Sequence, residues 1–327
     1  MKTHSTQLKS HTGFGLIELL VAITLASILI AGAVTVYSQS RKTFRASEEA
    51  ARLQETARYA MSFLESDLRM ANFWGLNNRA DHIINRAGQP GALNEGWVDG
   101  LCGTDWPIDL DRFVEAFDAT NDASTGLDCI DDTIDGSDVV VVRRVAEAPD
   151  TTTLNGGSLY LQASRIQGTL FVAAADCNAD DAACIPSGYL PPQSQSSAVR
   201  VNGYYVAENA DGVPSLRRKR LVAGPGILDE EIIPGVEDLQ VELGVDDDDD
   251  TTADYFVPAS AAPANASVVA VRLWLRVRSM QPDFSFLDDR TYSYSNGDDY
   301  TPDATDDANR YRRMLYSKTI QLRNTRT

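Results

Sequence analysis

The chain has 327 residues, of which 43% are hydrophobic, and its 47 acidic residues outnumber 29 basic ones to give a formal net charge of −18. This composition excludes a disordered chain, and the length allows one or two folded domains. A strongly acidic protein repels nucleic acid phosphates and anionic membranes, so nucleic acid is an unlikely partner.

The N-terminus changes abruptly from polar to apolar. Residues 1–13 carry Lys2 and Lys9 and no acid, and an apolar run starts at Phe14. Residues 19–37 contain no charge, a length of nineteen, close to the ~20 residues that a membrane-spanning helix needs. The run predicts a membrane-inserted helix.

One carboxylate, Glu18, lies near the start of this run. A charged side chain at the centre of a membrane helix costs about 2.5–3.5 kcal/mol, and less near the interface. Cleavage after Gly13 would create a new amine at Phe14, and such an ion pair at ~4 Å is worth about 4 kcal/mol before desolvation. We expect Glu18 to pair with that amine, within the chain or between neighbouring chains, and so to set the register of packed helices.

The sequence from Gly13 to Ile23, GFGLIELLVAI, resembles the class III signal of type IV prepilins and type II pseudopilins. The resemblance implies that prepilin peptidase removes a leader, residues 1–13, by cleaving between Gly13 and Phe14. It also implies N-methylation of Phe14 and a role for Glu18 in subunit recruitment.

Two other interpretations of the N-terminus stay open. An ordinary signal peptide could be cleaved after Ala31-Gly32-Ala33, or the helix could be an uncleaved single-pass anchor. The first residue of the purified protein separates the three: methylated Phe14, Val34 or Met1.

The helical pattern continues beyond the apolar run. Small and apolar residues recur every three or four positions, and neither proline nor glycine interrupts residues 33–72: Leu53, Ala57, Ala60, Leu64, Leu68 and Ala71. This predicts one helix over residues 14–72, with 14–37 in the membrane or filament core and the far end packed under a globular head.

Residues 73–327 form the predicted head. After a loop-rich stretch, residues 76–136, short β-branched segments indicate strands at 138–144, 158–162, 169–174, 199–206, 239–245, 269–278 and 315–323. In residues 269–278 apolar side chains alternate with arginines and Trp274. Strands that follow one long helix predict an α+β fold with a largely antiparallel sheet on that helix.

Further segments resemble the PilW family of minor pilins: RLQETARYA at 52–60, DLRMA at 67–71, GVEDLQ at 235–240, 271–279, and TIQLRN at 319–324. The resemblance implies a pilin-like fold and assembly with other minor and major pilins, in a complex that primes the type IV pilus at its tip and can carry an adhesin. The subunit would wait in the inner membrane of a Gram-negative bacterium, head in the periplasm, before reaching the cell surface. A type II secretion pseudopilin of the J kind and a membrane-anchored periplasmic enzyme or sensor remain as alternatives.

The four cysteines all follow the apolar run, so an anchored chain would hold them in an oxidising periplasm. We expect disulfides between Cys102 and Cys129 and between Cys177 and Cys184, although four cysteines allow three pairings and free thiols are the alternative. The family often has a cysteine where this chain has Leu76, which keeps the pairing open.

Catalysis and cofactor binding are not expected. After leader removal His82 is the one histidine left, which argues against a histidine-rich metal site or a Ser-His-Asp triad. The run Asp246–Asp250 predicts a solvated hairpin tip, with calcium binding as the alternative, because the spaced ligands of an EF-hand are missing. The basic cluster Arg217–Arg220 is expected on an exposed strand or paired with acids, with DNA binding as the alternative.

Overall fold

A computed structural model describes residues 13, 15–77, 79–88, 93, 102, 105–118, 129–130, 132–186, 193–224, 226–261, 266–295, 297, 299–304 and 307–325. Residues 1–12 of the predicted leader and the predicted methylation site, Phe14, lie outside these residues. The chain divides into two compact units, Met1–Ala51 and Arg52–Thr327.

One long helix, α1 (Leu16–Leu68), confirms the predicted helix. Its buried residues begin at Leu53 and repeat at helical spacing through Leu68, the pattern of a one-sided helix. The helix ends four residues before the predicted Asn72, which has a left-handed conformation with φ 60°. L-residues adopt that conformation singly in turns and not inside an α-helix.

The larger of two sheets in the second unit has eight strands. Its main path runs β1 (Ile83–Ile84), β5 (Gly168–Val172), β4 (Leu159–Ser164), β6 (Ser194–Glu208), β3 (Asp138–Val145) and β2 (Val114–Asp118). Strand β6 also pairs with β7 (Pro214–Val222), which forms a hairpin with β8 (Gly226–Pro234). All these pairs are antiparallel except β1 with β5.

The smaller sheet has the order β10 (Tyr255–Pro258), β9 (Val236–Asp246), β11 (Ser267–Arg278) and β12 (Arg313–Gln321), all antiparallel. Its strand β11 has the predicted two faces: Val271, Leu273, Leu275 and Val277 belong to the main core, whereas Trp274 and Arg276, although buried, do not. Short 3-10 helices occur at Ala80–His82, Ala259–Ala261 and Ala308–Arg310.

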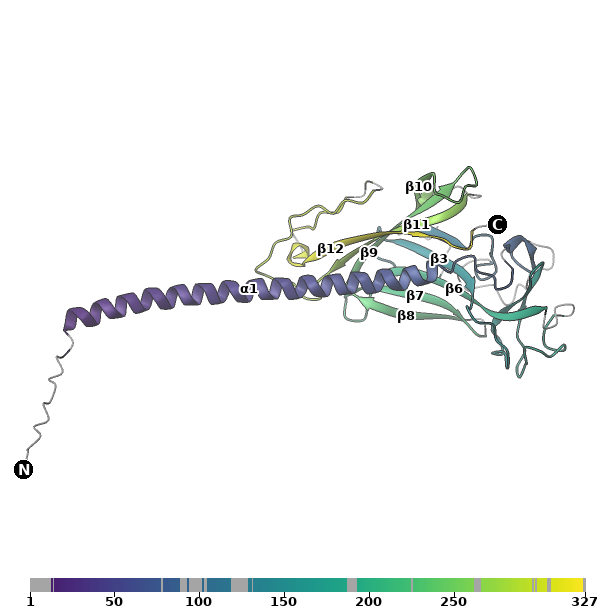
Figure 1. The fold of residues 1–327 in the computed structure, drawn as a ribbon, viewed down its shortest axis with the longest axis horizontal. Helices are drawn as coiled ribbons and strands as arrows, with labels where there is room; N and C mark the ends of the chain where they lie inside the picture. Colours follow the sequence, from purple (N-terminus) through teal and green to yellow (C-terminus); the bar gives the residue numbers. More distant parts are fainter. Residues whose placement is uncertain are drawn as a thin grey trace, which may run out of the picture. The chain divides into compact units, whose positions relative to one another are not determined.

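The main hydrophobic core lies where α1, from Leu53 onward, meets apolar faces of both sheets (Figure 1). Strand β3 shows why a strand can be buried on both faces: Val140 and Val142 belong to this core, while Val139 and Val141 belong to a second cluster with Trp74. A continuous apolar run is typical of such a strand. The α+β fold with one long helix and a largely antiparallel head is therefore confirmed.

All seven predicted strands exist, but the sequence analysis missed five: β1, β2, β7, β8 and β10. The region 76–136, predicted to be loop-rich, contains β1 and β2. The sequences of β7 and β8 do not alternate between apolar and polar residues, because β7 contains the run RRKR and β8 the run DEE. The pattern that indicates a strand is therefore missing. The compact second unit starts at Arg52, so it includes the last part of α1.

Candidate assembly site

The first part of α1 presents apolar side chains to its surroundings. Every described residue from Gly15 to Arg45 is exposed, including Leu16, Leu29 and Phe44, each at 70% or more. Among the described residues, α1 is the helix that is long and apolar enough to cross a membrane. Exposed apolar surface on this scale is typical of membrane insertion or of contact with other proteins.

Glu18 lies in the first turn of this helix, after the exposed Gly13. Its Oε2 accepts a hydrogen bond from the Gly15 backbone N–H at 3.1 Å. The contact is one half of a capping box, and a negative charge there also complements the helix dipole. The carboxylate therefore turns back toward the N-terminal end of the helix, where the predicted cleavage would place a new amine one residue before Gly15.

At the other end of α1, Asp67 joins the helix to the larger sheet. Its carboxylate, 4% exposed, accepts hydrogen bonds from Arg144 Nε at 2.5 Å, Asn202 Nδ2 at 2.8 Å and the Tyr204 hydroxyl at 2.8 Å. Burial and the Asp67 charge raise the pKa of Tyr204 well above its usual range, so the phenol remains a donor. The sequence analysis missed this anchor, although an acid on the apolar stripe of a helix was its signal.

A buried ionic cluster lies on the smaller sheet, on the face of β11 opposite the core. Glu237 accepts hydrogen bonds from Arg276 Nε at 3.0 Å and from Arg313 Nε and Nη2 at 2.7 and 2.8 Å. Arg278 Nη1 lies 3.8 Å from the same carboxylate. Burial raises the pKa of Glu237, but the hydrogen bonds and charge of Arg313 and Arg276 outweigh it, so the pKa is lowered overall.

The segment 279–312, between β11 and β12, covers this cluster. Arg276 Nη1 donates to Asp238 at 3.1 Å and to the hydroxyl of Tyr294 within the segment, and the ring of Tyr300 lies 3.6 Å from the Arg276 guanidinium. As a result Arg276 is 7% exposed. The sequence analysis placed these arginines on the face of β11 opposite its apolar residues and did not predict their cover; acids on β9 and four tyrosines in the following segment were the signal for it.

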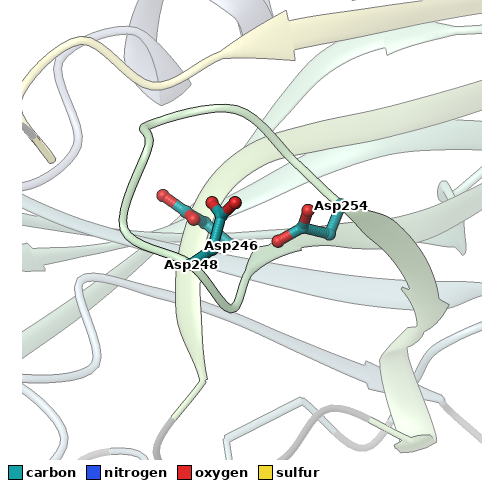
Figure 2. A group of neighbouring side chains, drawn as sticks. All are labelled: Asp246, Asp248 and Asp254. Carbon is teal, nitrogen blue, oxygen red and sulfur yellow. The ribbon is translucent and has the colours of Figure 1, made fainter.

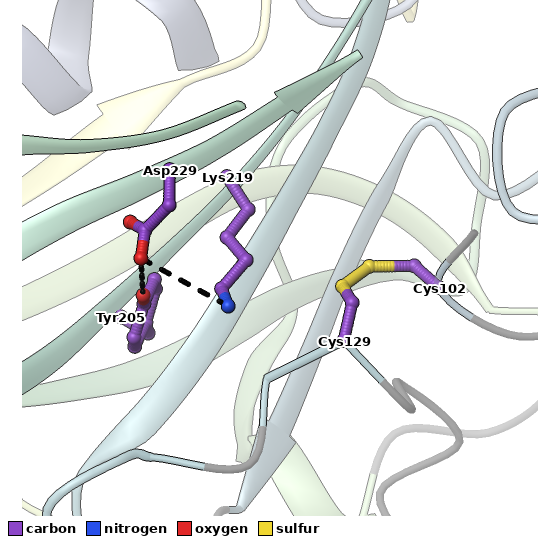
Figure 3. The surroundings of a disulfide bond; sticks show 5 residues. All are labelled: Cys102, Cys129, Tyr205, Lys219 and Asp229. Carbon is purple, nitrogen blue, oxygen red and sulfur yellow. Dashed lines mark hydrogen bonds and ion pairs between the residues drawn. A yellow bond between two sulfur atoms is a disulfide. The ribbon is translucent and has the colours of Figure 1, made fainter. Parts of the chain in front are cut away.

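The basic cluster Arg217–Arg220 lies on β7, where acids of β8 pair with it. Arg217 and Lys219 form ion pairs with Asp229, while Arg218 and Arg220 pair with Glu230. Figure 3 shows Asp229 between Lys219 and Tyr205, whose hydroxyl donates to it at 3.0 Å. The expected pairing with acidic neighbours is confirmed.

The aspartate run forms the loop of the β9–β10 hairpin, as predicted. Figure 2 shows Asp246, Asp248 and Asp254 around this loop, and their carboxylate oxygens lie within 4.8 Å of one another. Each carboxylate also accepts a backbone N–H of the loop: Thr251 donates to Asp246, Asp250 to Asp248 and Asp247 to Asp254. The charge of Asp250 raises the pKa of Asp248.

We expect calcium to leave this loop unchanged. At least one oxygen of each carboxylate already accepts a loop amide, and residues 246–254 contain no glutamate that could act as a bidentate ligand. Isothermal calorimetry should therefore record only the heat of dilution up to about 1 mM calcium. A saturable signal that disappears in Asp246→Asn would contradict this expectation.

Both disulfides join the pairs expected from the sequence. Cys102 and Cys129 have their Cα atoms 4.8 Å apart, and Cys177 and Cys184 have theirs 5.5 Å apart. Figure 3 shows the first bond, whose Cys102 belongs to the core cluster around Trp74. The second bond closes a short loop, and Cys177 packs in a small hydrophobic cluster with Tyr160 of β4 and Phe171 of β5. Both bonds therefore lie beside the larger sheet.

Comparisons with known proteins match both ends of the chain. Residues 203–324 match the model of the type IV pilus-assembly protein W family, and residues 8–34 match the prokaryotic N-terminal methylation motif. Among solved structures, a type IV-like pilin from Thermus thermophilus is similar at 22% identity, covering 53% of this chain and 87% of that chain, with a TM-score of 0.22. No curated protein matches significantly.

The two family matches agree with the geometry. The methylation motif spans Gly13, Phe14 and Glu18 at the start of the exposed apolar helix, and the PilW match spans the smaller sheet with its ionic cluster. The chain is therefore similar to PilW-type pilins over residues 203–324 and carries a class III prepilin-type methylation motif at residues 8–34.

Proposed function

We propose that this protein is a minor pilin that loses residues 1–13, is held in the inner membrane by residues 14–37, and enters a type IV pilus through the same helix. The observation that carries this proposal is the position of Glu18, an acid in the first turn of an exposed apolar helix and five residues after the cleavage site. Prepilin peptidase would be the processing partner, as the methylation motif supports.

Glu18 gives the assembled helices a preferred register. In an apolar bundle its charge is costly unless a cation lies nearby. The methylated amine of Phe14 on a neighbouring subunit would supply that cation, so that packing is most favourable when each carboxylate faces an amine. The Gly15 hydrogen bond keeps the carboxylate at the end of the helix where such an amine would lie.

We further propose that the subunit joins other minor and major pilins in a complex that primes assembly, and that it lies at the filament tip, where it can carry an adhesin. The description of the matched family as a pilus-assembly protein supports the assembly role. In this proposal the head contributes binding surface to partner subunits and performs no catalysis.

The variant Glu18→Ala should be processed normally but fail to assemble. Loss of the charge pair removes a few kcal/mol of register-specific attraction, so incorporation into sheared pili should fall by roughly tenfold or more. Immunoblots of sheared pili and membranes measure this ratio. Glu55→Ala, which removes an exposed acid later on the same helix, is the matched control and should assemble normally.

Mass spectrometry of the mature protein tests the processing step independently. N-methylated Phe14 is the expected first residue, and a chain that begins with Met1 or Val34 would overturn the proposal. In a deletion strain we expect loss of surface pili and twitching with normal protein secretion. The opposite phenotype would instead identify a secretion pseudopilin.

A further inference from the structure

Four arginines line a cavity of about 360 Å³ formed by β3, β6 and β7. Arg144 comes from β3, Arg200 from β6, and Arg218 and Arg220 from β7. The cavity borders the contact between Asp67 and the larger sheet, because Arg144, which donates a hydrogen bond to Asp67, also lines the cavity. On a chain with a net charge of −18, this concentration of guanidinium groups stands out.

Strand register places these charges together. Arg144 lies directly opposite Arg200 in the β3–β6 pair, and Asn202, two residues along on the same face, lies opposite Arg220 in the β6–β7 pair. Like charges opposite each other across two strands destabilise a sheet. The arrangement therefore costs stability unless anions compensate it.

The internal compensation is incomplete. Arg144 is paired with Asp67, and Arg218 and Arg220 share the single carboxylate of Glu230. Among the described residues, the exposed side chain of Arg200 makes no hydrogen bond or ion pair, and its charge acts on nearby Tyr160. Its five N–H donors are available to an anion from outside.

A second cavity, of about 470 Å³, shares Arg200, Arg220 and Leu221 with the first. Asp150 and Tyr160 are among its other lining residues, and Glu147 lines the first cavity. The shared arginines thus lie at the junction of a groove whose two ends also carry acids. Such a groove suits a short acid-rich segment better than an extended polyanion.

We propose that this arginine groove, defined by Arg144, Arg200, Arg218 and Arg220, binds carboxylates of an acid-rich protein segment. A guanidinium matches a carboxylate in a planar, two-point contact that is stronger than a neutral hydrogen bond. The acidic chain and the acids Glu147 and Asp150 disfavour nucleic acid, which needs an extended basic track. The proposal does not depend on pilus assembly.

A labelled peptide with the sequence of residues 245–254, VDDDDDTTAD, is a suitable probe because it supplies closely spaced carboxylates. Fluorescence anisotropy with the full chain in nonionic detergent should show saturable binding that weakens as salt is raised. In Arg200→Gln the dissociation constant should rise by roughly tenfold, since one charge-assisted contact is lost. Arg165→Gln, which removes an exposed arginine from the β4–β5 turn, is the matched control and should bind like the unmodified chain.

Each result decides the matter. Selective loss in Arg200→Gln, at an unchanged unfolding temperature, supports the groove. The proposal is overturned if the unmodified chain does not bind the peptide, if Arg165→Gln loses as much affinity, or if an asparagine version of the peptide binds equally well. Tighter binding of an oligothymidylate with the same number of charges would contradict the protein segment as the ligand.

Discussion

Glu237→Gln is expected to lower the free energy of unfolding by about 3–5 kcal/mol, the usual cost of removing one partner from a buried ion pair. In the native protein the Glu237 carboxylate neutralises part of the positive charge of Arg276 and Arg313, which donate hydrogen bonds to it, and of nearby Arg278. A neutral amide cannot do so. Urea unfolding followed by circular dichroism measures the difference.

Glu208→Gln serves as the control, because Glu208 is an exposed acid at the end of β6. Its substitution should change stability by no more than about 0.5 kcal/mol. If the Glu237 variant lost as little as this control, the ionic cluster would not be what holds the segment 279–312 on the smaller sheet.

The same cluster should make the head sensitive to acid. Glu237 has a lowered pKa, and the hydrogen bonds of Ser285 and Arg312 lower the pKa of Asp283 in the covering segment to about 2. A carboxyl whose pKa is lower in the folded state stabilises the protein above its unfolded pKa of about 4 and loses that contribution as pH falls through the folded value. The unfolding temperature should therefore drop between about pH 4 and 2, and less steeply in Glu237→Gln.

Asp67→Ala should have a comparable effect, about 3–5 kcal/mol, because it leaves the half-buried Arg144 without its counter-ion and removes the acceptor for the buried Asn202 and Tyr204. The damage should concentrate where α1 meets the larger sheet. Hydrogen exchange should accelerate in residues 57–68 more than in the smaller sheet.

Asp67→Asn keeps the shape and one acceptor oxygen, so its loss should be smaller than that of Asp67→Ala. Asp211→Asn, in the exposed β6–β7 turn, controls for the chemical change and should be close to neutral. Equal exchange rates in α1 for Asp67→Ala and the unmodified chain would show that apolar packing alone fastens the helix.

Patterns of hydrophobicity predicted the parts of the fold that depend on local periodicity. The stripe from Leu53 to Leu68 predicted the buried face of α1, and the alternation in β11 predicted its core side. The missed strands β7 and β8 are held by cross-strand ion pairs, such as Arg218 with Glu230. Those pairs become visible only when two segments are already aligned.

The functional and structural sites also divide into those with a local sequence signal and those that depend on contacts between distant segments. Glu18 could be singled out because one charge in an apolar run is a local anomaly. The role of Asp67 could not, since it depends on Arg144, which is 77 residues away in the chain. Likewise, the cover over the β11 arginines depends on Tyr294 and Tyr300, which come from a later segment of the chain.

The segment 279–312 is fastened by charges and phenols, and all four cysteines lie outside it, on the larger sheet's side of the head. Closure of the smaller sheet therefore needs no disulfide, so this part of the head can fold before its cysteines are oxidised. A reducing agent should loosen the loops around Trp74 and Cys177 while the smaller sheet keeps its shape.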